Sequence, residues 1–446
     1  MGRSWCSIEA SAGLLLAFAV CGCAHYRPEP LPAAPDLQKT PELTVPARQF
    51  WLPGLTPHRV APQGLDEITV ITLAVFNNPD LKAARLRAGV AQAQLLAAGL
   101  LPDPQVDANF ATSALNYGGV LGLSEEVQAL LTRGAAKSAA GAAVQQVNLE
   151  ILWQEWQVAE RARELFIEIR MDKQLQEVLS SARSLLEDRY RRDQAAMQRG
   201  DETQGIVAAD LNALADADTS QRQLETETNA NRHALNALLG LQPEAQLHLT
   251  GQTTAPSVSE DEFERELASL PQRRADLLAL QAGYRSQEEA LRRAVLAQFP
   301  ALSAGVEFER DPVEGVNAIG PQVSMSLPLF NRNRGQIAIQ KATRELLRQT
   351  YQARLDGAQS QADEVWRATK ILERQAKDLD GQLPLLEKSA DSAQQGMQEY
   401  NVNAALYVTL ESNLLTKRAE AIRLHASLDS ARSALNTLLG LPFRAQ

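Results

Sequence analysis

The fold is decided by residues 142–199, which read AAVQQVNLEILWQEWQVAERARELFIEIRMDKQLQEVLSSARSLLEDRYRRDQAAMQR. These 58 residues contain neither Gly nor Pro. A continuous helix of this length would extend roughly 87 Å at ~1.5 Å per residue, far beyond the helices of an ordinary globular domain. Every seventh position is apolar except one, along Val144, Ile151, Val158, Leu165, Asp172, Leu179 and Leu186. A second apolar seam runs beside it through Leu149, Trp153, Trp156, Phe166, Leu175, Val178 and Leu185. Two such seams predict a supercoiled helix with a neighbour on each side.

The same pattern returns later in the chain. A second seven-residue ladder starts at Ile337 and passes through Arg344, Tyr351, Ala358, Val365, Leu372, Leu379, Leu386, Ala393 and Tyr400. The helix end ALNALLGL at 234–241 recurs as ALNTLLGL at 434–441. The sequence therefore predicts an internally duplicated helical protein.

Composition favours long helices. Of the 446 residues, 45% are hydrophobic, 22% are charged and only 5% are aromatic. The formal net charge is −10 and no basic run interrupts it, so nucleic acid is not an expected partner.

The N-terminus predicts export and lipid anchoring. Residues 1–22 resemble a secretory signal peptide, with an apolar stretch at 10–20 that is too short to cross a bilayer. Gly22 precedes Cys23 as in a bacterial lipoprotein cleavage site, so Cys23 is the expected lipidation residue. A plain secretory leader is the alternative. Residues 23–64 are rich in proline and are expected to form an extended linker. No later segment reaches the ~18 uninterrupted apolar residues of a membrane helix.

The first repeat, residues 65–250, is expected to alternate between helices and one strand pair. Its expected elements are a helix over 65–76, a helix from the Asn78-Pro79-Asp80 cap to about 101, a hairpin over 105–128 that turns at 116–119, a long helix from about 134 to 200, a helix over 206–239 and a short strand over 247–253.

The second repeat, residues 251–446, follows the same order. It begins with a helix over 259–270 that has a capping-box pattern, and a helix from 274 to 298 follows. Residues 302–309 and 319–329 then alternate between apolar side chains and small or charged ones, which suits the wall of a membrane barrel; a soluble sheet edge is the alternative. Pro384 interrupts the second long helix and predicts a kink. Four strands cannot close a barrel, so a membrane location requires several chains to share one.

Three groups of motifs carry a family resemblance. SLPLFNRNRG at 326–335 resembles the strand-to-helix junction of the TolC-type outer-membrane efflux channels, and is most like their metal-cation branch. The Asn-Pro-Asp-Leu start at 78–81 and the two Ala-Leu-Asn-x-Leu-Leu-Gly-Leu ends are similar to the same family. The resemblance covers about residues 65–441.

The resemblance implies a mainly helical fold with a small β part. Each protomer of a homotrimer would contribute two β-hairpins to a twelve-stranded outer-membrane barrel, above a periplasmic tube of long helices. The family implies a passive exit duct of a tripartite efflux pump, which docks a periplasmic adaptor that an inner-membrane transporter feeds. The exported substrates would be metal cations or small toxic compounds.

Site residues carried over from the resemblance lie at the helix-to-helix turns. Gly200, Asp201 and Thr203 form the first expected docking turn, in which Gly200 can adopt the left-handed conformation. Tyr400 and Asn403 mark the second, where Asn403 stands in place of the family's usual Gly and is expected to be left-handed as well. Plain helix capping is the alternative role for residues 201–203.

A pore-narrowing acid after the second turn is only partly matched. Thr409 and Ser412 occupy the aligned positions, and Glu411 lies one residue away. Asp210 and Glu411 remain candidate gate acids, with simple surface charge as the favoured interpretation.

Catalytic chemistry is not expected. The five histidines are dispersed without metal-ligand spacing, and the glycines at 118, 119 and 122 are read as turn residues and not as a phosphate loop. No enzyme activity, metal site or cofactor is therefore predicted. Two other functions remain: a type I protein-secretion duct on the same fold, or a periplasmic adaptor lipoprotein, which would show one helical hairpin and small β-domains. A lipid-anchored enzyme lacks any supporting site.

Overall fold

The computed structural model describes residues 26–40, 64–112, 117–251, 253, 255–311, 313–314, 316–399 and 403–441. The signal peptide, Cys23 and most of the linker lie outside the described residues. The chain divides into two units, residues 1–37 and 38–446. Residues 26–37 of the first unit form no helix or strand. All elements discussed below belong to the second unit.

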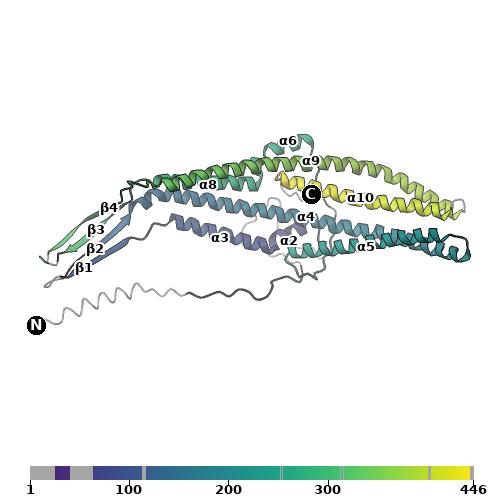
Figure 1. The fold of residues 1–446 in the computed structure, drawn as a ribbon, viewed down its shortest axis with the longest axis horizontal. Helices are drawn as coiled ribbons and strands as arrows, with labels where there is room; N and C mark the ends of the chain where they lie inside the picture. The colour runs from purple at the N-terminus through teal and green to yellow at the C-terminus, as the bar shows by residue number, and fades with distance from the viewer. Residues whose placement is uncertain are drawn as a thin grey trace. The chain divides into compact units, whose positions relative to one another are not determined.

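The first half of this unit contains four helices and two strands (Figure 1). They are α2 (Glu67–Asn77), α3 (Pro79–Gly99), β1 (Gln105–Thr112), β2 (Tyr117–Glu126), α4 (Val127–Arg199) and α5 (Gln204–Leu238). The order of long helix, turn and shorter helix follows the sequence prediction.

The second half repeats that order with a short additional helix. Its elements are α6 (Glu260–Ala268), α7 (Leu270–Arg273), α8 (Ala275–Leu296), β3 (Leu302–Arg310), β4 (Asn317–Met325), α9 (Arg334–Gln398) and α10 (Ala404–Leu438). The four strands form one antiparallel sheet in the order β1-β2-β3-β4, so the two hairpins pair through β2 and β3.

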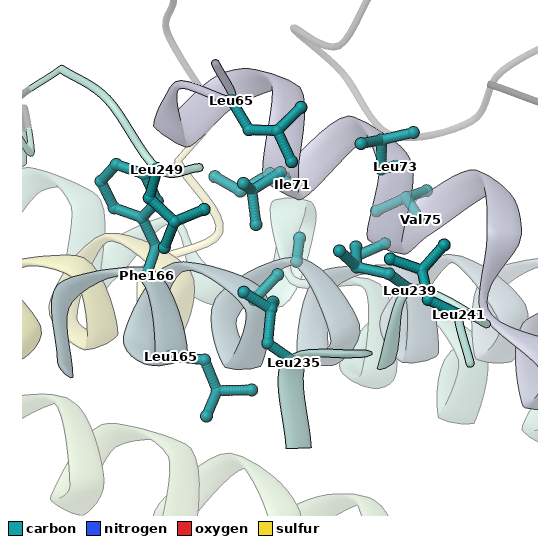
Figure 2. Packing of buried hydrophobic residues seen from close by; sticks show 14 of the residues in the cluster. Leu65, Ile71, Leu73, Val75, Leu165, Phe166, Leu235, Leu239, Leu241 and Leu249 are labelled. Atoms are coloured by element: carbon teal, nitrogen blue, oxygen red, sulfur yellow. The ribbon is translucent and has the colours of Figure 1, made fainter. Parts of the chain in front are cut away.

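Helix α4 is the central element of the packing. Its 73 residues contact α2, α3 and α5 from the first half and α8 and α10 from the second. Leu165 and Phe166 of α4 lie in the largest apolar cluster, against Ile71 of α2 and Leu235 of α5 (Figure 2). The predicted neighbours on both sides of this helix are confirmed.

The two halves anchor their helices in the same way. Asn78 caps α3 by accepting from the Leu81 N–H (2.9 Å), and its amide donates to the Leu238 carbonyl at the end of α5 (3.1 Å). In the second half Arg274 stands at the start of α8 and donates to the Leu438 carbonyl at the end of α10 (3.4 Å). The glycines that follow, at 240 and 440, both have φ of 66°. The duplication seen in sequence thus extends to individual hydrogen bonds.

A buried polar network joins the halves. Arg163 of α4 pairs with Glu67 of α2 and donates to the Ser433 hydroxyl of α10 (3.3 Å). The hydroxyls of Ser433 and Thr437 both donate to Glu160 at 2.7 Å. Burial raises the pKa of Glu160, and these hydrogen bonds oppose the rise. Because an unpaired buried charge is costly, this network favours one relative position of α2, α4 and α10.

Asp172 is the single polar residue in the first apolar seam of α4. It is 1% exposed and accepts a hydrogen bond from Asn231 of α5 (3.2 Å). Burial raises the pKa of its carboxyl group. A polar pair inside an apolar seam opposes helix sliding, because a shift would leave the carboxylate without its donor.

Several predicted boundaries were wrong. Helix α4 begins at Val127, before Gly134, because that glycine is exposed and a helical glycine costs only about 1 kcal/mol. Gly118 and Gly119 belong to β2 and pair with β1, so they are not the hairpin turn.

The second half and the segment after α5 also differ from prediction. No strand forms in the described part of 247–253, where Leu65 pairs with Leu249 as a single bridge. Strand β4 ends at Met325, before Pro328, which cannot donate to a ladder. Pro384 lies inside α9, and the kink expected there stays a prediction.

We expect Asn78→Ala to lower the stability of the helical body by about 2 kcal/mol, because it removes a helix cap and leaves the Leu238 carbonyl without its side-chain donor. Thermal unfolding followed by circular dichroism would measure the change. Ser259→Ala is the matched control, since Ser259 caps the short helix α6 through one exposed bond of 3.3 Å. A larger loss in the control than in Asn78→Ala would contradict this assignment.

Candidate functional site

The four-stranded sheet has one polar and one largely apolar face. Because directly paired residues point to the same side, the register defines the polar rows Gln105–Ser124–Gly305–Gln322 and Asp107–Gly122–Glu307–Gly320. The next row adds Glu309 beside Asn109 and Val120. The rows between them carry apolar side chains: Val106, Leu121, Leu123, Val306, Phe308 and Ile319.

The apolar face is exposed to an unusual degree. Ile319 is 77% exposed and Phe110 is 85% exposed, and the other apolar side chains of this face are also on the surface. A continuous exposed apolar surface of this kind marks a contact with lipid or with protein. The expectation that one side of these strands is apolar and the other is polar is confirmed.

Both edges of the sheet lack a neighbouring strand. β1 pairs only with β2, and β4 pairs only with β3, within the part of the chain that the structure describes. Exposed edge strands present rows of free backbone N–H and C=O groups that pair readily with another chain. In hydrocarbon, such unpaired backbone groups would cost several kcal/mol each.

The first helix-to-helix turn has the predicted glycine conformation. Gly200 ends α4 with φ of 82°, its N–H donates to the Met197 carbonyl (3.0 Å), and the Asp201 N–H donates to Ala196 (2.9 Å). Asp201 is 65% exposed and pairs with Arg199 at 3.1 Å. Thr203 stands at the start of α5, yet its side chain makes no capping hydrogen bond. Side-chain capping therefore does not account for Thr203.

The second turn differs from the prediction. Asn403 has φ of −75°, so it is not left-handed; its side chain caps α10 by accepting from the Leu406 N–H at 2.8 Å. An asparagine can satisfy a helix start or adopt the left-handed conformation, and here the capping bond prevails. Tyr400 lies outside the described residues.

Asp210 is not a surface charge. It is 4% exposed and pairs with Arg189 of α4 (2.8 Å). Burial, together with a hydrogen bond that the protonated Asp210 carboxyl donates to Asp193, raises the pKa of Asp210 to about 6, and Arg189 opposes the rise. The negative charge of Glu202 in the turn raises the pKa of Asp210 further. The first tip therefore contains a buried carboxyl group that titrates in a physiological pH range.

Glu411 lies elsewhere on the tip. It is half-buried on α10, where its charge raises the pKa of Tyr407 in addition to the larger effect of burial. Arg192 of α4 acts on the same Tyr407 in the opposite direction. No hydrogen bond or ion pair between described residues joins Asp210 to Glu411, so the two candidate acids do not form one site.

Sequence reasoning missed Arg189 and Asp193 as the partners of Asp210. A signal was present, because Arg189 and Asp210 stand at nearly equal distances on either side of the Gly200 turn. Residues placed in this way face each other when the two helices of a hairpin fold back. Arg189 and Asp193 are also one helical turn apart, which places both on the same face of α4.

The described residues contain no group of three or more His, Cys, Asp or Glu side chains arranged to hold a metal ion. None of their helices is long and apolar enough to cross a membrane.

Comparison with known proteins identifies the architecture. Neither a family model nor a curated protein matches the sequence. Among solved structures, the outer-membrane channel OprN superposes with a TM-score of 0.70 at 15% identity, covering 84% of this chain and 89% of that one. CusC, described in terms of transmembrane channel formation, gives 0.69 at 14% identity over 90% and 99% of the two chains. The open state of the Neisseria gonorrhoeae outer-membrane channel MtrE gives 0.69 at 14% identity over 89% and 98%.

The chain has the fold of these outer-membrane channels. At such identities the likeness establishes the arrangement of helices and strands. It covers 84–90% of this chain and therefore extends over both repeats.

Acidification should stabilise the first tip. A carboxyl group whose pKa is raised on folding contributes stability that is complete below its ordinary pKa and is lost as pH rises through about 6. We therefore expect amide hydrogen exchange across 189–210, corrected for intrinsic rates, to show stronger protection at pH 5 than at pH 7.5. Asp210→Asn should remove most of this difference, whereas Asp201→Asn, an exposed substitution at the same tip, should retain it. Equal pH dependence in all three proteins would contradict the assignment to Asp210.

Proposed function

We propose that this protein is the outer-membrane exit duct of a tripartite efflux pump, which works as a homotrimer. In this proposal the strands lie in the outer membrane, where Cys23 adds a lipid anchor, and the helices project into the periplasm. A periplasmic adaptor docks at the helix-to-helix turns, and an inner-membrane transporter supplies the energy.

The observation that carries this proposal is the unfinished sheet. Its four strands have two open edges and an exposed apolar face, a combination that is stable in lipid only when further strands close the circle. Three copies of the chain would supply twelve strands with no free edge. The same fold in OprN, CusC and MtrE, each described as an outer-membrane or transmembrane channel, supports this arrangement.

The polar face supports cations as the transported species. Asp107 and Glu307 share one row, and Glu309 extends the acidic surface along β3. If the apolar face meets lipid, these carboxylates face the water-filled interior, where three copies would form acidic rings. Rings of Asp and Glu side chains favour cations in channels. Metal cations are thus the proposed substrate class over larger neutral compounds.

The two helical hairpins distinguish this proposal from an adaptor. An adaptor was expected to have one helical hairpin with small β-domains. This chain pairs α4 with α5 and α9 with α10, and its strands form one shared sheet. Both hairpins end in turns remote in sequence from the strands, which suits docking at one end and membrane insertion at the other.

The channel and its charge preference can be tested together. The wild-type chain, purified from outer-membrane fractions, should run as a heat-modifiable trimer and conduct cations in preference to anions in planar bilayers. Glu307→Lys should keep the trimer but shift the zero-current potential in a salt gradient towards anion permeability, because it changes six units of charge in three copies. Glu314→Lys, in the loop between β3 and β4, is the matched control and should shift it less. A periplasmic monomer without conductance would refute the duct.

Docking at the first turn can be tested at Gly200. A β-branched residue at φ of 82° costs roughly 1–2 kcal/mol locally, while nothing within 4 Å obstructs its Cβ. Gly200→Val should therefore retain the trimer but reduce cross-linking to the adaptor that copurifies with wild type, and reduce efflux. Gly205→Val introduces the same side chain in the neighbouring first turn of α5, where φ is ordinary. Efflux that is unchanged in Gly200→Val, or lost only in Gly205→Val, would reject this docking turn.

A further inference from the structure

A polar cleft lies on the first repeat, away from the sheet and the turns. Its volume is about 510 Å³, within the range of small-molecule sites. The cleft is bounded by α4, α5 and the segment 243–249 that follows α5. None of its residues takes part in the strand faces, the acidic rows or the docking turns described above.

The lining of this cleft is strongly basic. Arg170 and Lys173 of α4 line it together with Arg232 of α5, and His233 and His248 complete the basic side chains. Glu244 is the only acid in the lining. This concentration of positive charge stands out in a chain whose net charge is −10.

These cations form no ion pairs within the described residues. No ion pair or hydrogen bond there engages the side chains of Arg170, Lys173 or Arg232. Arg232 acts only at longer range on Asp172, whose carboxylate is buried and accepts from Asn231. Most other arginines between 161 and 199 do form ion pairs, as Arg163, Arg183 and Arg189 show.

The second repeat shows what this position looks like when it is neutralised. A shift of 200 residues places Lys370, Glu373 and Arg432 at the positions of Arg170, Lys173 and Arg232. There Glu373 pairs with Lys370 at 3.1 Å and with Arg432 at 3.0 Å. The first repeat has lysine in place of this central glutamate. Lys173 therefore adds a third positive charge to those of Arg170 and Arg232, at the position where the second repeat has a negative charge.

A buried amide also lines the cleft. Asn236 is 2% exposed and donates to the carbonyls of Pro243 and Ala245 at 3.0 Å each. Its side-chain oxygen has no hydrogen-bond partner among the described residues, and neither has that of the equivalent Asn436. This feature is common to both repeats, so the charge difference alone distinguishes the cleft.

We infer that this cleft binds a small polyanion that carries two or more carboxylate or phosphate groups, with Arg170, Lys173 and Arg232 as its charge partners. An acidic group of the ligand takes the place that the Glu373 carboxylate has in the second repeat. The site does not depend on the channel role, because it lies outside the strands and the turns.

The test uses the full-length wild-type chain in detergent at 150 mM NaCl, titrated calorimetrically with citrate and with tripolyphosphate, and with glycerol as the uncharged control. We expect at least one anion to bind with a dissociation constant below about 1 mM, and glycerol not to bind. Binding of citrate but not of tripolyphosphate would assign a carboxylate ligand. Binding of tripolyphosphate but not of citrate would assign a phosphate ligand.

The decisive variant is Lys173→Glu, which recreates the Lys370–Glu373–Arg432 pattern of the second repeat. It should weaken binding at least tenfold and leave thermal unfolding in the absence of ligand unchanged or improved, because it gives both arginines a partner. Lys341→Glu makes the same charge change at an exposed position on α9 and should bind as wild type does. Failure of both anions to bind wild type, or equal binding by Lys173→Glu, would overturn the site. Conductance of the trimer is a separate readout, so either conclusion can fail without the other.

Discussion

The structure depends on the burial of α4 by both halves of the chain. One helix of 73 residues offers two apolar seams, and neither half could cover both. The first half covers one side with α2, α3 and α5, and the second covers the other with α8 and α10. Apolar surface removed from water stabilises the fold by about 25 cal/mol per Å². Most of the stability of a helix in a protein comes from such packing, so α4 depends on these partners. The duplicated chain is thus one folding unit around a shared helix.

Polar groups then define how this apolar assembly fits together. Apolar seams alone would tolerate sliding by a heptad, but buried polar partners do not. Asp172 needs its side-chain donors on α5, Asn231 and Thr228, to lie opposite it, and Arg163 reaches both Glu67 and Ser433 from one position. The Asn78 and Arg274 bonds to equivalent carbonyls fix the ends of the shorter helices. The pattern is general for long helical proteins, in which apolar burial supplies most of the stability and a few polar contacts supply the register.

Features that depend on local chemistry could be predicted from sequence, and those that depend on contacts across helices could not. The long helices, the strand alternation and the left-handed Gly200 follow from nearby residues, and all are present. Asn403 was misjudged because asparagine suits two competing local structures, and only the position of Leu406 decides between them. Asp210 was taken for a surface charge because its burial depends on Arg189 and Asp193 in the preceding helix. The basic cleft could be recognised only from the structure, which brings its residues from α4 and α5 together, combined with a position-by-position comparison of the two repeats.

In their described residues, the two helix-to-helix connections are not alike. α4 ends in a left-handed glycine, and α10 starts with an asparagine cap. In the homotrimer proposed above, these two kinds of helix end would alternate around the threefold axis, with three of each. A partner that contacts both kinds would meet two unequal surfaces, so its arrangement would keep threefold symmetry.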